Sequence, residues 1–175
     1  MSVDRVETPR LYLERLTMEH VDDVSRLLRD PRVGRWIWHG LDEPPTEQDV
    51  IGGLAEKVGH WERHGFGLWL LRDKASGDAV GRGGLQWTYA VDLHEVEAAW
   101  ALVPERWGEG LATELALASV DTAFGPLGLQ EIIAFTLPDN VGSRRVMEKA
   151  GFVYERVIVH VGLQHVLYRR RAPGG

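Results

Sequence analysis

The chain of 175 residues contains no cysteine. Disulfide bonds, thiolate metal ligands and a cysteine nucleophile are therefore excluded together. The chain also lacks any run that approaches the roughly 20 apolar residues of a membrane span. Its first residues, MSVDRVETPR, carry charges where a signal peptide has its apolar segment. We therefore expect a cytoplasmic protein with no membrane partner.

An excess of positive charge is absent as well. The formal net charge is -6, so no general field attracts nucleic acid or an anionic membrane. The basic cluster Arg169-Arg170-Arg171 is short, and we expect no nucleic-acid partner. Hydrophobic residues make up 44% and charged residues 26%, as in ordinary globular proteins. The length suits one domain, which we place at residues 1–175.

Apolar periodicity and capping residues predict a mixed α/β fold. The predicted helices cover approximately residues 18–29, 46–64, 110–124 and 140–150. The predicted strands cover approximately residues 10–16, 66–72, 79–88, 95–103, 132–137, 152–160 and 163–170. Asp30-Pro31 ends the first helix, and residues 33–45 are expected to form a loop. The sheet is expected to be largely antiparallel, with one central βαβ unit over residues 95–137.

The stretch ERWGEGLATE, residues 105–114, joins a predicted strand to a predicted helix. Gly108 and Gly110 would leave backbone N–H groups uncovered at the helix N-terminus, where a phosphate binds favourably. The stretch lacks the Gly-Lys-Ser/Thr ending of a P-loop and the third glycine of the dinucleotide fingerprint. On spacing alone, a phosphate site and an ordinary tight turn are both open.

A second motif, LPDNVGSRRVMEKAGF, follows the next predicted strand. Together with AAWALVPERWGEGLATELA it resembles the GNAT superfamily of acetyl-CoA-dependent N-acetyltransferases, in particular the RimJ/RimL branch. The resemblance extends over about residues 8–168, and the motifs occur in the family's order. It implies the GNAT fold, in which splayed parallel strands form a coenzyme A cleft. It also implies acetyl-CoA as co-substrate, no metal and an amine acceptor; a homodimer is suggested by the family alone.

The resemblance assigns the coenzyme contacts residue by residue. The family's pyrophosphate loop, Gln/Arg-x-x-Gly-x-Gly/Ala, falls on residues 107–112, with Trp107 in place of the usual Gln or Arg. The pantetheine arm is expected to lie along residues 95–103 as an additional strand. The implied coenzyme-binding residues are Ala101, Leu102, Val103, Trp107, Gly108, Glu109, Gly110, Leu111, Ala112, Thr113, Asn140, Ser143 and Arg145.

Glu97 is the candidate general base. With the diphosphate at Gly108, six residue steps back from Val103 span about 20 Å of strand, which places the thioester between about Glu97 and Ala101. A carboxylate there could take the proton of an ammonium acceptor, directly or through a water. A solvent-facing glutamate is the alternative interpretation, and Glu95 on the same face is a second candidate base.

Ser143 is the candidate proton donor to the departing coenzyme thiolate. It lies one helical turn after Asn140, so the two side chains share a face. Many family members carry a tyrosine acid at the position of Met147, which cannot donate a proton. Tyr168 and Tyr154 are held in reserve. A serine that only satisfies the first turn of its helix is the alternative.

Aromatic residues are expected to wall the acceptor pocket. The family's N-terminal helical region implies substrate contacts from Trp36, Trp38 and His39, with Trp87 and Tyr89 as the facing wall. Core packing is an equal alternative for at least one tryptophan. The stretch HWERH, residues 60–64, lacks the order and the third ligand of a zinc site, so we expect a solvated helix face and no metal.

The predicted function is acetyl transfer from acetyl-CoA to a primary amine, either a protein N-terminus or a small molecule. Without cysteine an acyl-cysteine intermediate is impossible, so direct attack in a ternary complex is the simplest mechanism. A non-catalytic acyl-CoA sensor with the same fold is the principal alternative, and a nucleotide-binding regulator is the second. The sequence names neither the acceptor nor the acyl-chain specificity.

Overall fold

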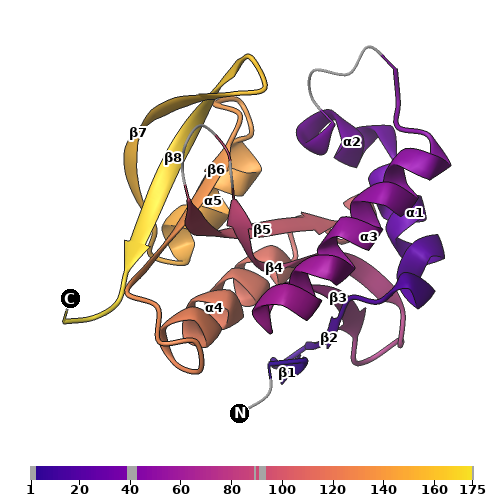
Figure 1. Ribbon diagram of the computed structural model, residues 1–175, viewed down its shortest axis with the longest axis horizontal. Coiled ribbons are helices and arrows are strands. Elements are labelled where there is room, and N and C mark those ends of the chain that lie inside the picture. Colours follow the sequence, from indigo (N-terminus) through magenta and orange to yellow (C-terminus); the bar gives the residue numbers. More distant parts are fainter. Residues whose placement is uncertain (1–2, 39–42, 89, 91–93, 175) are drawn as a thin grey trace.

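The computed structural model describes residues 3–38, 43–88, 90 and 94–174. A single eight-stranded sheet runs through it in the order β1-β2-β3-β4-β5-β6-β8-β7 (Figure 1). The strands are β1 (Arg5–Glu7), β2 (Leu11–Arg15), β3 (Leu68–Asp73), β4 (Ala79–Thr88), β5 (Glu95–Leu102), β6 (Glu131–Thr136), β7 (Val153–His160) and β8 (Leu163–Arg171). The α-helices are α1 (Val21–Leu28), α2 (Pro31–Ile37), α3 (Glu47–His64), α4 (Leu111–Phe124) and α5 (Val141–Lys149).

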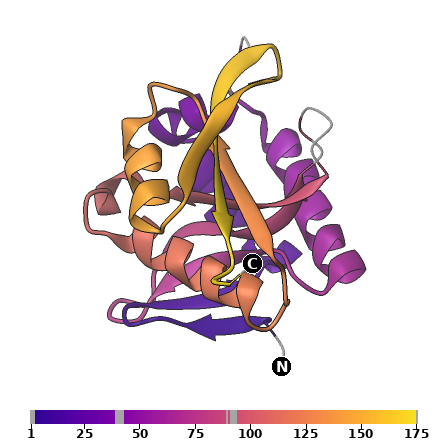
Figure 2. The same cartoon turned by 90° about the vertical axis from the view of Figure 1, so that its left-hand side faces the viewer.

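The sheet is antiparallel except between β5 and β6, which confirms the predicted fold class. These two strands are parallel and are connected through α4, as the predicted βαβ unit requires. α1 and α3 pack on one face of the sheet, while α4 and α5 cover the other. Figure 2 shows α3, in magenta, and α4 with α5, in orange, on opposite sides of the strands.

Residues 33–45 do not form the expected uninterrupted loop, because α2 occupies Pro31–Ile37. Asp30 caps this helix by accepting a hydrogen bond from the Arg32 N–H at 2.9 Å, and Pro31 occupies its first turn. Proline ends one helix but also favours the start of another, since its missing N–H would be unpaired there anyway. The pair that ends α1 therefore also begins α2, and Trp36 belongs to a helix.

The remaining helix ends follow their local signals. Thr46 forms a capping box with Asp49 at the start of α3, and Gly65 ends that helix with φ +71°. Gly151 follows α5 with φ +80°, the left-handed conformation expected of it. Within the part of the chain that the structure describes, no helix is both long and apolar enough to span a bilayer.

Successive side chains of β5 point to opposite faces of the sheet and so pack in two different buried clusters. Val96, Ala98 and Leu102 pack in the larger cluster beneath α4, as predicted for one face of this strand. Ala99 and Ala101 contact the smaller cluster formed with α1 and α3. The face that carries Glu97 is therefore turned toward the N-terminal helices, which determines where its carboxylate lies.

Candidate active site

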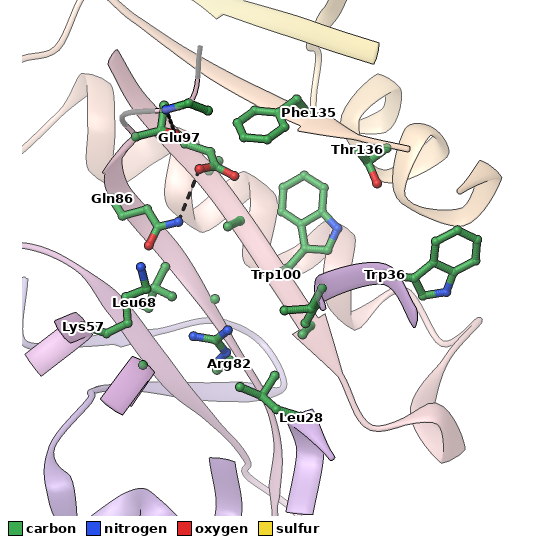
Figure 3. Close-up of a pocket in the computed structure, with 18 of the residues that line it drawn as sticks. Leu28, Trp36, Lys57, Leu68, Arg82, Gln86, Glu97, Trp100, Phe135 and Thr136 are labelled. Atoms are coloured by element: carbon green, nitrogen blue, oxygen red, sulfur yellow. Dashed lines mark hydrogen bonds between the residues drawn. The ribbon is translucent and has the colours of Figure 1, made fainter. Parts of the chain in front are cut away.

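A cavity of about 700 Å³ lies between the N-terminal helices and the sheet. Its wall combines β4 and β5 with residues at the ends of β6 and α5, and Figure 3 shows its labelled side chains. The residues of the glycine stretch 107–113, all of which are described, do not contribute to this wall. Of the predicted site residues, the cavity gathers Trp36, Trp38, Trp87, Glu97, Ala101, Asn140 and Ser143.

Glu97 lies on the cavity wall with only 9% of its surface exposed. Its Oε2 accepts a hydrogen bond from Gln86 Nε2 at 3.3 Å (Figure 3). Burial raises the pKa of Glu97 to about 7, although hydrogen bonds from Gln86 and Thr88 act in the opposite direction. A carboxyl group with that pKa exchanges protons near neutral pH, which suits a general base. The solvent-facing alternative does not describe this side chain.

Glu95, the second candidate base, is occupied elsewhere. Its carboxylate is paired with Arg169 of β8, which also binds Glu155 at 2.5 Å and Glu131 at 2.9 Å. Glu95 does not line the cavity. Its charge holds the C-terminal strands in place, and Glu97 is the better candidate.

β5 and β6 separate on one side of Glu97. β4 pairs with β5 from Glu95 to Leu102, whereas the β5–β6 ladder contains one residue pair, Glu97 with Ile133. Among the described residues, no further ladder pair joins the edge of β5 to β6 on the C-terminal side of Glu97. This gap is the splayed cleft that the family resemblance implies, and an extended ligand could add to the edge as a strand does.

The peptide groups that face the gap differ from those predicted. The Val103 N–H donates to the Val80 carbonyl at 2.9 Å, so it is turned toward β4. Successive residues of a strand direct their peptide groups to opposite sides, so Ala101 also faces β4. Trp100 and Leu102 face the gap instead. A pantetheine arm would therefore meet the main chain of these two residues rather than that of Ala101 and Val103.

The glycine stretch combines both of its alternatives, a tight turn and an open approach. Gly108 and Gly110 have φ values of +81° and +84°, which side-chain-bearing residues rarely adopt. A Cβ atom at Gly108 would meet no protein atom within 4 Å, and one at Gly110 would meet only Arg10 Nη2, at 3.5 Å. The turn therefore leaves open space at the N-terminus of α4.

Ion pairs brace this turn from the side. Arg10 Nη1 donates to the Glu109 carbonyl at 2.8 Å, and Arg10 Nε donates to Glu114 Oε2 at 2.8 Å. Thr8 Oγ1 and the Arg10 N–H both donate to Glu114 Oε1, at 2.5 and 2.7 Å. Arg106 holds the Glu109 carboxylate at 2.8 Å. The conformation of the turn is thus set before any ligand binds.

Trp107 replaces the family's usual Gln or Arg and has a contact of its own. Its indole Nε1 donates to the Leu102 carbonyl at 2.8 Å, which ties the turn to the end of β5. The side chain is 48% exposed. Compared with Gln or Arg, tryptophan offers no polar side-chain contact to a phosphate, but its hydrogen bond to Leu102 fixes the turn to β5.

α5 brings the second motif to the cavity. Asn140 Oδ1 accepts from the Ser143 N–H at 3.3 Å, and Asn140 Nδ2 donates to Thr136 Oγ1 at 3.0 Å. Asn140 thus fixes the start of α5 to the end of β6. Ser143 lines the cavity, and among the described residues its hydroxyl has no hydrogen-bond partner. Met147, at the position of the family's tyrosine, is buried on the same wall.

The tyrosines held in reserve lie outside the cavity. Tyr168 is 2% exposed, and its hydroxyl accepts from Arg144 Nε at 3.2 Å and donates to Glu148 at 3.3 Å. Tyr154 is half exposed and packs edge-on against Tyr168. Neither lines the cavity, so Ser143 is the better placed hydroxyl. Arg145 is exposed on α5, outside the cavity wall.

The aromatic wall is partly as predicted. Trp36, Trp38 and Trp87 line the cavity, and Trp38 Nε1 donates to the Leu28 carbonyl at 3.1 Å, which anchors the residue after α2. His39 and Tyr89 lie outside the described residues.

Both ring nitrogens of His60 are hydrogen-bonded to the main chain, one of them at Trp87 of this wall. Its Nε2 accepts from the Trp87 N–H at 3.0 Å, so the Nδ1 hydrogen is donated to the Phe66 carbonyl at 2.9 Å. His60 is buried, and this burial lowers its pKa. The expectation of a solvated face over residues 60–64 is therefore wrong at His60. Within the described ranges, no cluster of His, Asp and Glu has the arrangement of a metal site.

The wall also contains polar and aromatic residues that were not predicted. Gln86 supports Glu97, and Trp100 lies between β5 and α5 (Figure 3). Arg82 of β4 and Lys57 of α3 place two cationic side chains on the same wall. The available signal for Arg82 was its setting in the strand sequence GRGG, where a charged side chain stands among glycines.

Comparisons with known proteins agree with this geometry. The family model for the acetyltransferase (GNAT) domain matches residues 10–153. The uncharacterized N-acetyltransferase YnaD of Bacillus subtilis is 38% identical over 146 residues, covering 83% of this chain and 81% of its own. A putative GnaT-family acetyltransferase from Bordetella pertussis superposes with a TM-score of 0.80 at 27% identity, covering 95% of this chain and 98% of its own.

The fold is also shared with the RimJ/RimL branch. RimL, an alpha-N-protein acetyltransferase solved in complex with coenzyme A, has a TM-score of 0.75 at 16% identity, with 95% of this chain and 97% of its own covered. At that identity the likeness concerns the fold alone. The family match over most of the chain, together with the cleft, shows that this protein belongs to the GNAT acetyltransferase family and is an acyltransferase.

Proposed function

We propose that the protein transfers an acetyl group from acetyl-CoA to a primary amine, with Glu97 as the general base. The observation that carries this proposal is the position of Glu97. Its carboxyl group is buried on the cavity wall, in the Glu97–Ile133 pair of the β5–β6 ladder, and its pKa is about 7. A base is therefore present where the cleft and the cavity meet.

The need for a base follows from the acceptor's charge. A primary amine is an ammonium ion at neutral pH and has no lone pair for attack until it loses a proton. Glu97 takes this proton, and Gln86 orients the carboxylate through its 3.3 Å hydrogen bond. Because burial favours the neutral acid, the protonated Glu97 that results is tolerated without a counter-ion.

Several residues fit the coenzyme. Acetyl-CoA supplies the acetyl group as an activated thioester. The N–H groups of residues 108–113 suit its diphosphate, the Trp100 peptide group and the Leu102 N–H suit its extended arm, and exposed Arg145 suits its nucleotide end. The Trp100 N–H, on the gap side of β5, is suited to stabilise the negative charge that develops on the acetyl oxygen.

Direct transfer balances with the groups present. The amine nitrogen bonds to the acetyl carbon as the bond from that carbon to sulfur breaks. The ammonium proton passes to Glu97 and then to solvent, and the nitrogen loses its second proton to solvent after it has bonded to the acetyl carbon. The departing thiolate takes a proton from the Ser143 hydroxyl, which regains one from solvent. Ser143 suits this role because its hydroxyl lines the cavity and has no partner within the described ranges.

Thiol release tests the proposal. Acetyl-CoA is incubated with the protein and a panel of primary amines and peptides, and free coenzyme thiol is measured together with acetylated product by mass spectrometry. Release that requires an amine and is lost in Glu97→Gln supports transfer. Coenzyme binding by calorimetry with no release for any acceptor would instead favour the acyl-CoA sensor.

A further inference from the structure

Arg82 lines the cavity from β4. It lies on β4 opposite Ala101 of β5, and the glycines on either side of it are packed against β5. Its guanidinium lies on the cavity wall near Leu28 and Lys57 (Figure 3). Among the residues that the structure describes, no hydrogen bond or ion pair reaches this guanidinium. Burial lowers the pKa of Arg82 to about 10, so the group still carries its charge at neutral pH.

The charged groups nearby do not satisfy Arg82. Glu56 and Glu97 act on it only through space. Glu56 is paired with Lys57 at 3.4 Å, and its side chain is 69% exposed. Glu97 is hydrogen-bonded to Gln86. A desolvated cation without a partner is costly, whereas an anion that forms charge-assisted bonds with it recovers that cost. The arrangement fits a ligand that brings the anion.

Arg82 and Glu97 bracket a space suited to a small molecule. Glu97 stands opposite Gln86 in the sheet register, and Arg82 is four residues before Gln86 on the same strand. Even-numbered steps keep both side chains on one face, and four residues of strand span about 13 Å between Cα atoms. Both side chains line the cavity between these points.

We propose that the acceptor is a small amine that also carries a carboxylate, with its amino group at Glu97 and its carboxylate at Arg82. Lys57 lies on the same wall, where its ammonium group is paired with Glu56 at 3.4 Å. This inference rests on the proposed acetyl transfer and names its substrate class: free amino acids and related amino carboxylates.

The same charges disfavour a polycationic acceptor. A second ammonium group of a polyamine or aminoglycoside would face the Arg82 guanidinium, since the charge of Lys57 is offset by Glu56. The net charge of -6 would attract such a molecule to the protein, but that attraction is screened within about 10 Å in salt. Repulsion inside the cavity acts at short range and in a medium of lower dielectric constant, so it determines which acceptor binds.

The test compares acceptors that differ only in the carboxylate. A panel of amino acids, their primary amides and the corresponding diamines is assayed for thiol release with wild-type protein and with Arg82→Gln, Arg82→Lys and Arg29→Gln. Arg29 is an exposed arginine beyond the end of α1 and serves as the matched control.

We expect the wild type to prefer the carboxylates. Arg82→Gln should lower kcat/KM for the best amino acid by about 10- to 100-fold, the usual range for a lost charge-assisted bond. It should leave the amide within about twofold, and Arg82→Lys should fall between. Arg29→Gln should match the wild type. Thermal unfolding establishes that each variant is folded, and Arg82→Lys carries the comparison should Arg82→Gln unfold.

Two results would overturn the inference while leaving acetyl transfer intact. One is a wild type that uses amides or diamines better than amino acids. The other is an Arg82 variant in which amino acid and amide lose activity equally. Absence of thiol release with every acceptor class is a different outcome, because it contradicts the proposed function itself.

Discussion

The glycine turn and the acceptor cavity hold their charges in opposite ways. At the turn, Arg10, Arg106, Glu109 and Glu114 are paired with one another, and the ligand-facing surface is bare backbone. In the cavity, neither Glu97 nor Arg82 forms an ion pair within the described residues, although Lys57 and Arg82 act on Glu97 through space. Paired charges fix a shape, whereas unpaired charges remain available for a ligand.

This difference separates two kinds of recognition. The turn binds through the direction of its N–H groups, so its affinity depends on backbone conformation. The cavity selects among acceptors through buried side chains whose charged forms are poorly solvated. An acceptor with complementary charges therefore binds more tightly. Substitutions at the two regions should therefore fail in different assays, coenzyme binding for the turn and turnover or acceptor choice for the cavity.

The largest effect is expected from Glu97→Gln. Loss of the base should lower kcat by about 10²- to 10⁴-fold while acetyl-CoA affinity stays unchanged. The wild-type rate should rise with pH through about 7, because Glu97 is a base only above its pKa. The variant should lose this dependence. The ratio of the two rates should be greatest above pH 7 and below the pKa of the amine.

Glu95→Gln is the matched control on the same strand. It weakens the ion pair with Arg169 and should lower thermal stability, with little effect on kcat. The kcat of both variants is measured by thiol release at pH values from about 5.5 to about 9, on both sides of the expected pKa of about 7. Equal pH profiles for wild type and Glu97→Gln would remove Glu97 from the mechanism.

Gly110→Glu should have the next largest effect. The side chain adds strain at a φ of +84° and places a carboxylate where the diphosphate is expected. We expect coenzyme A affinity, measured by calorimetry, to fall by about 100-fold or more. Gly128→Glu carries a comparable strain at φ +62° in the turn after α4 and should leave the affinity unchanged. Equal losses in both variants would show that strain alone is responsible.

Ser143→Ala should lower kcat by about 10-fold if the hydroxyl protonates the thiolate, a modest part of the usual general-acid contribution. Ser143→Thr keeps the hydroxyl and should restore most of the rate. Both variants should unfold at the wild-type temperature, because the Ser143 N–H that donates to Asn140 belongs to the main chain and neither substitution removes it. Thermal unfolding therefore separates an effect on catalysis from an effect on the fold. An alanine variant as active as the wild type would leave Ser143 with a helix-start role only.

The smallest effect is expected from Arg10→Met. It removes the bonds to the Glu109 carbonyl and to Glu114, so the turn should lose its fixed conformation. We expect coenzyme A affinity to fall by about 3- to 10-fold with acceptor preference unchanged, because the pairs are partly exposed. Arg26→Met, which breaks a surface pair with Asp23, is the control. A changed acceptor preference would contradict the separation of the two regions.

Most elements of the fold could be predicted because their signals are local. Thr46, Asn140 and Gly151 each mark a helix end through their own side chain or conformation. β1 was missed because its three residues are too few to show alternation. α2 was missed because Asp30-Pro31 was taken only as a stop, although the same pair can start a helix.

The candidate site was predictable where it depends on spacing along one strand or helix. Glu97 follows from the strand's rise, and Ser143 follows from one helical turn after Asn140. The role of Arg82 was not accessible, since a charged residue in an alternating strand usually faces solvent. Only the packing of α1 and α3 over β4 turns that face into a cavity wall.

The single residue pair between β5 and β6 also bears on heat resistance. Among the described residues, strands β1–β5 and strands β6–β8 share that single ladder pair, and the Glu95–Arg169 ion pair and the packing of α4 beneath both also connect them. A ligand that occupies the gap would supply the missing rungs of the ladder and bind only the folded chain. Bound coenzyme should then raise the unfolding temperature and slow proteolysis, and both effects should increase with its concentration.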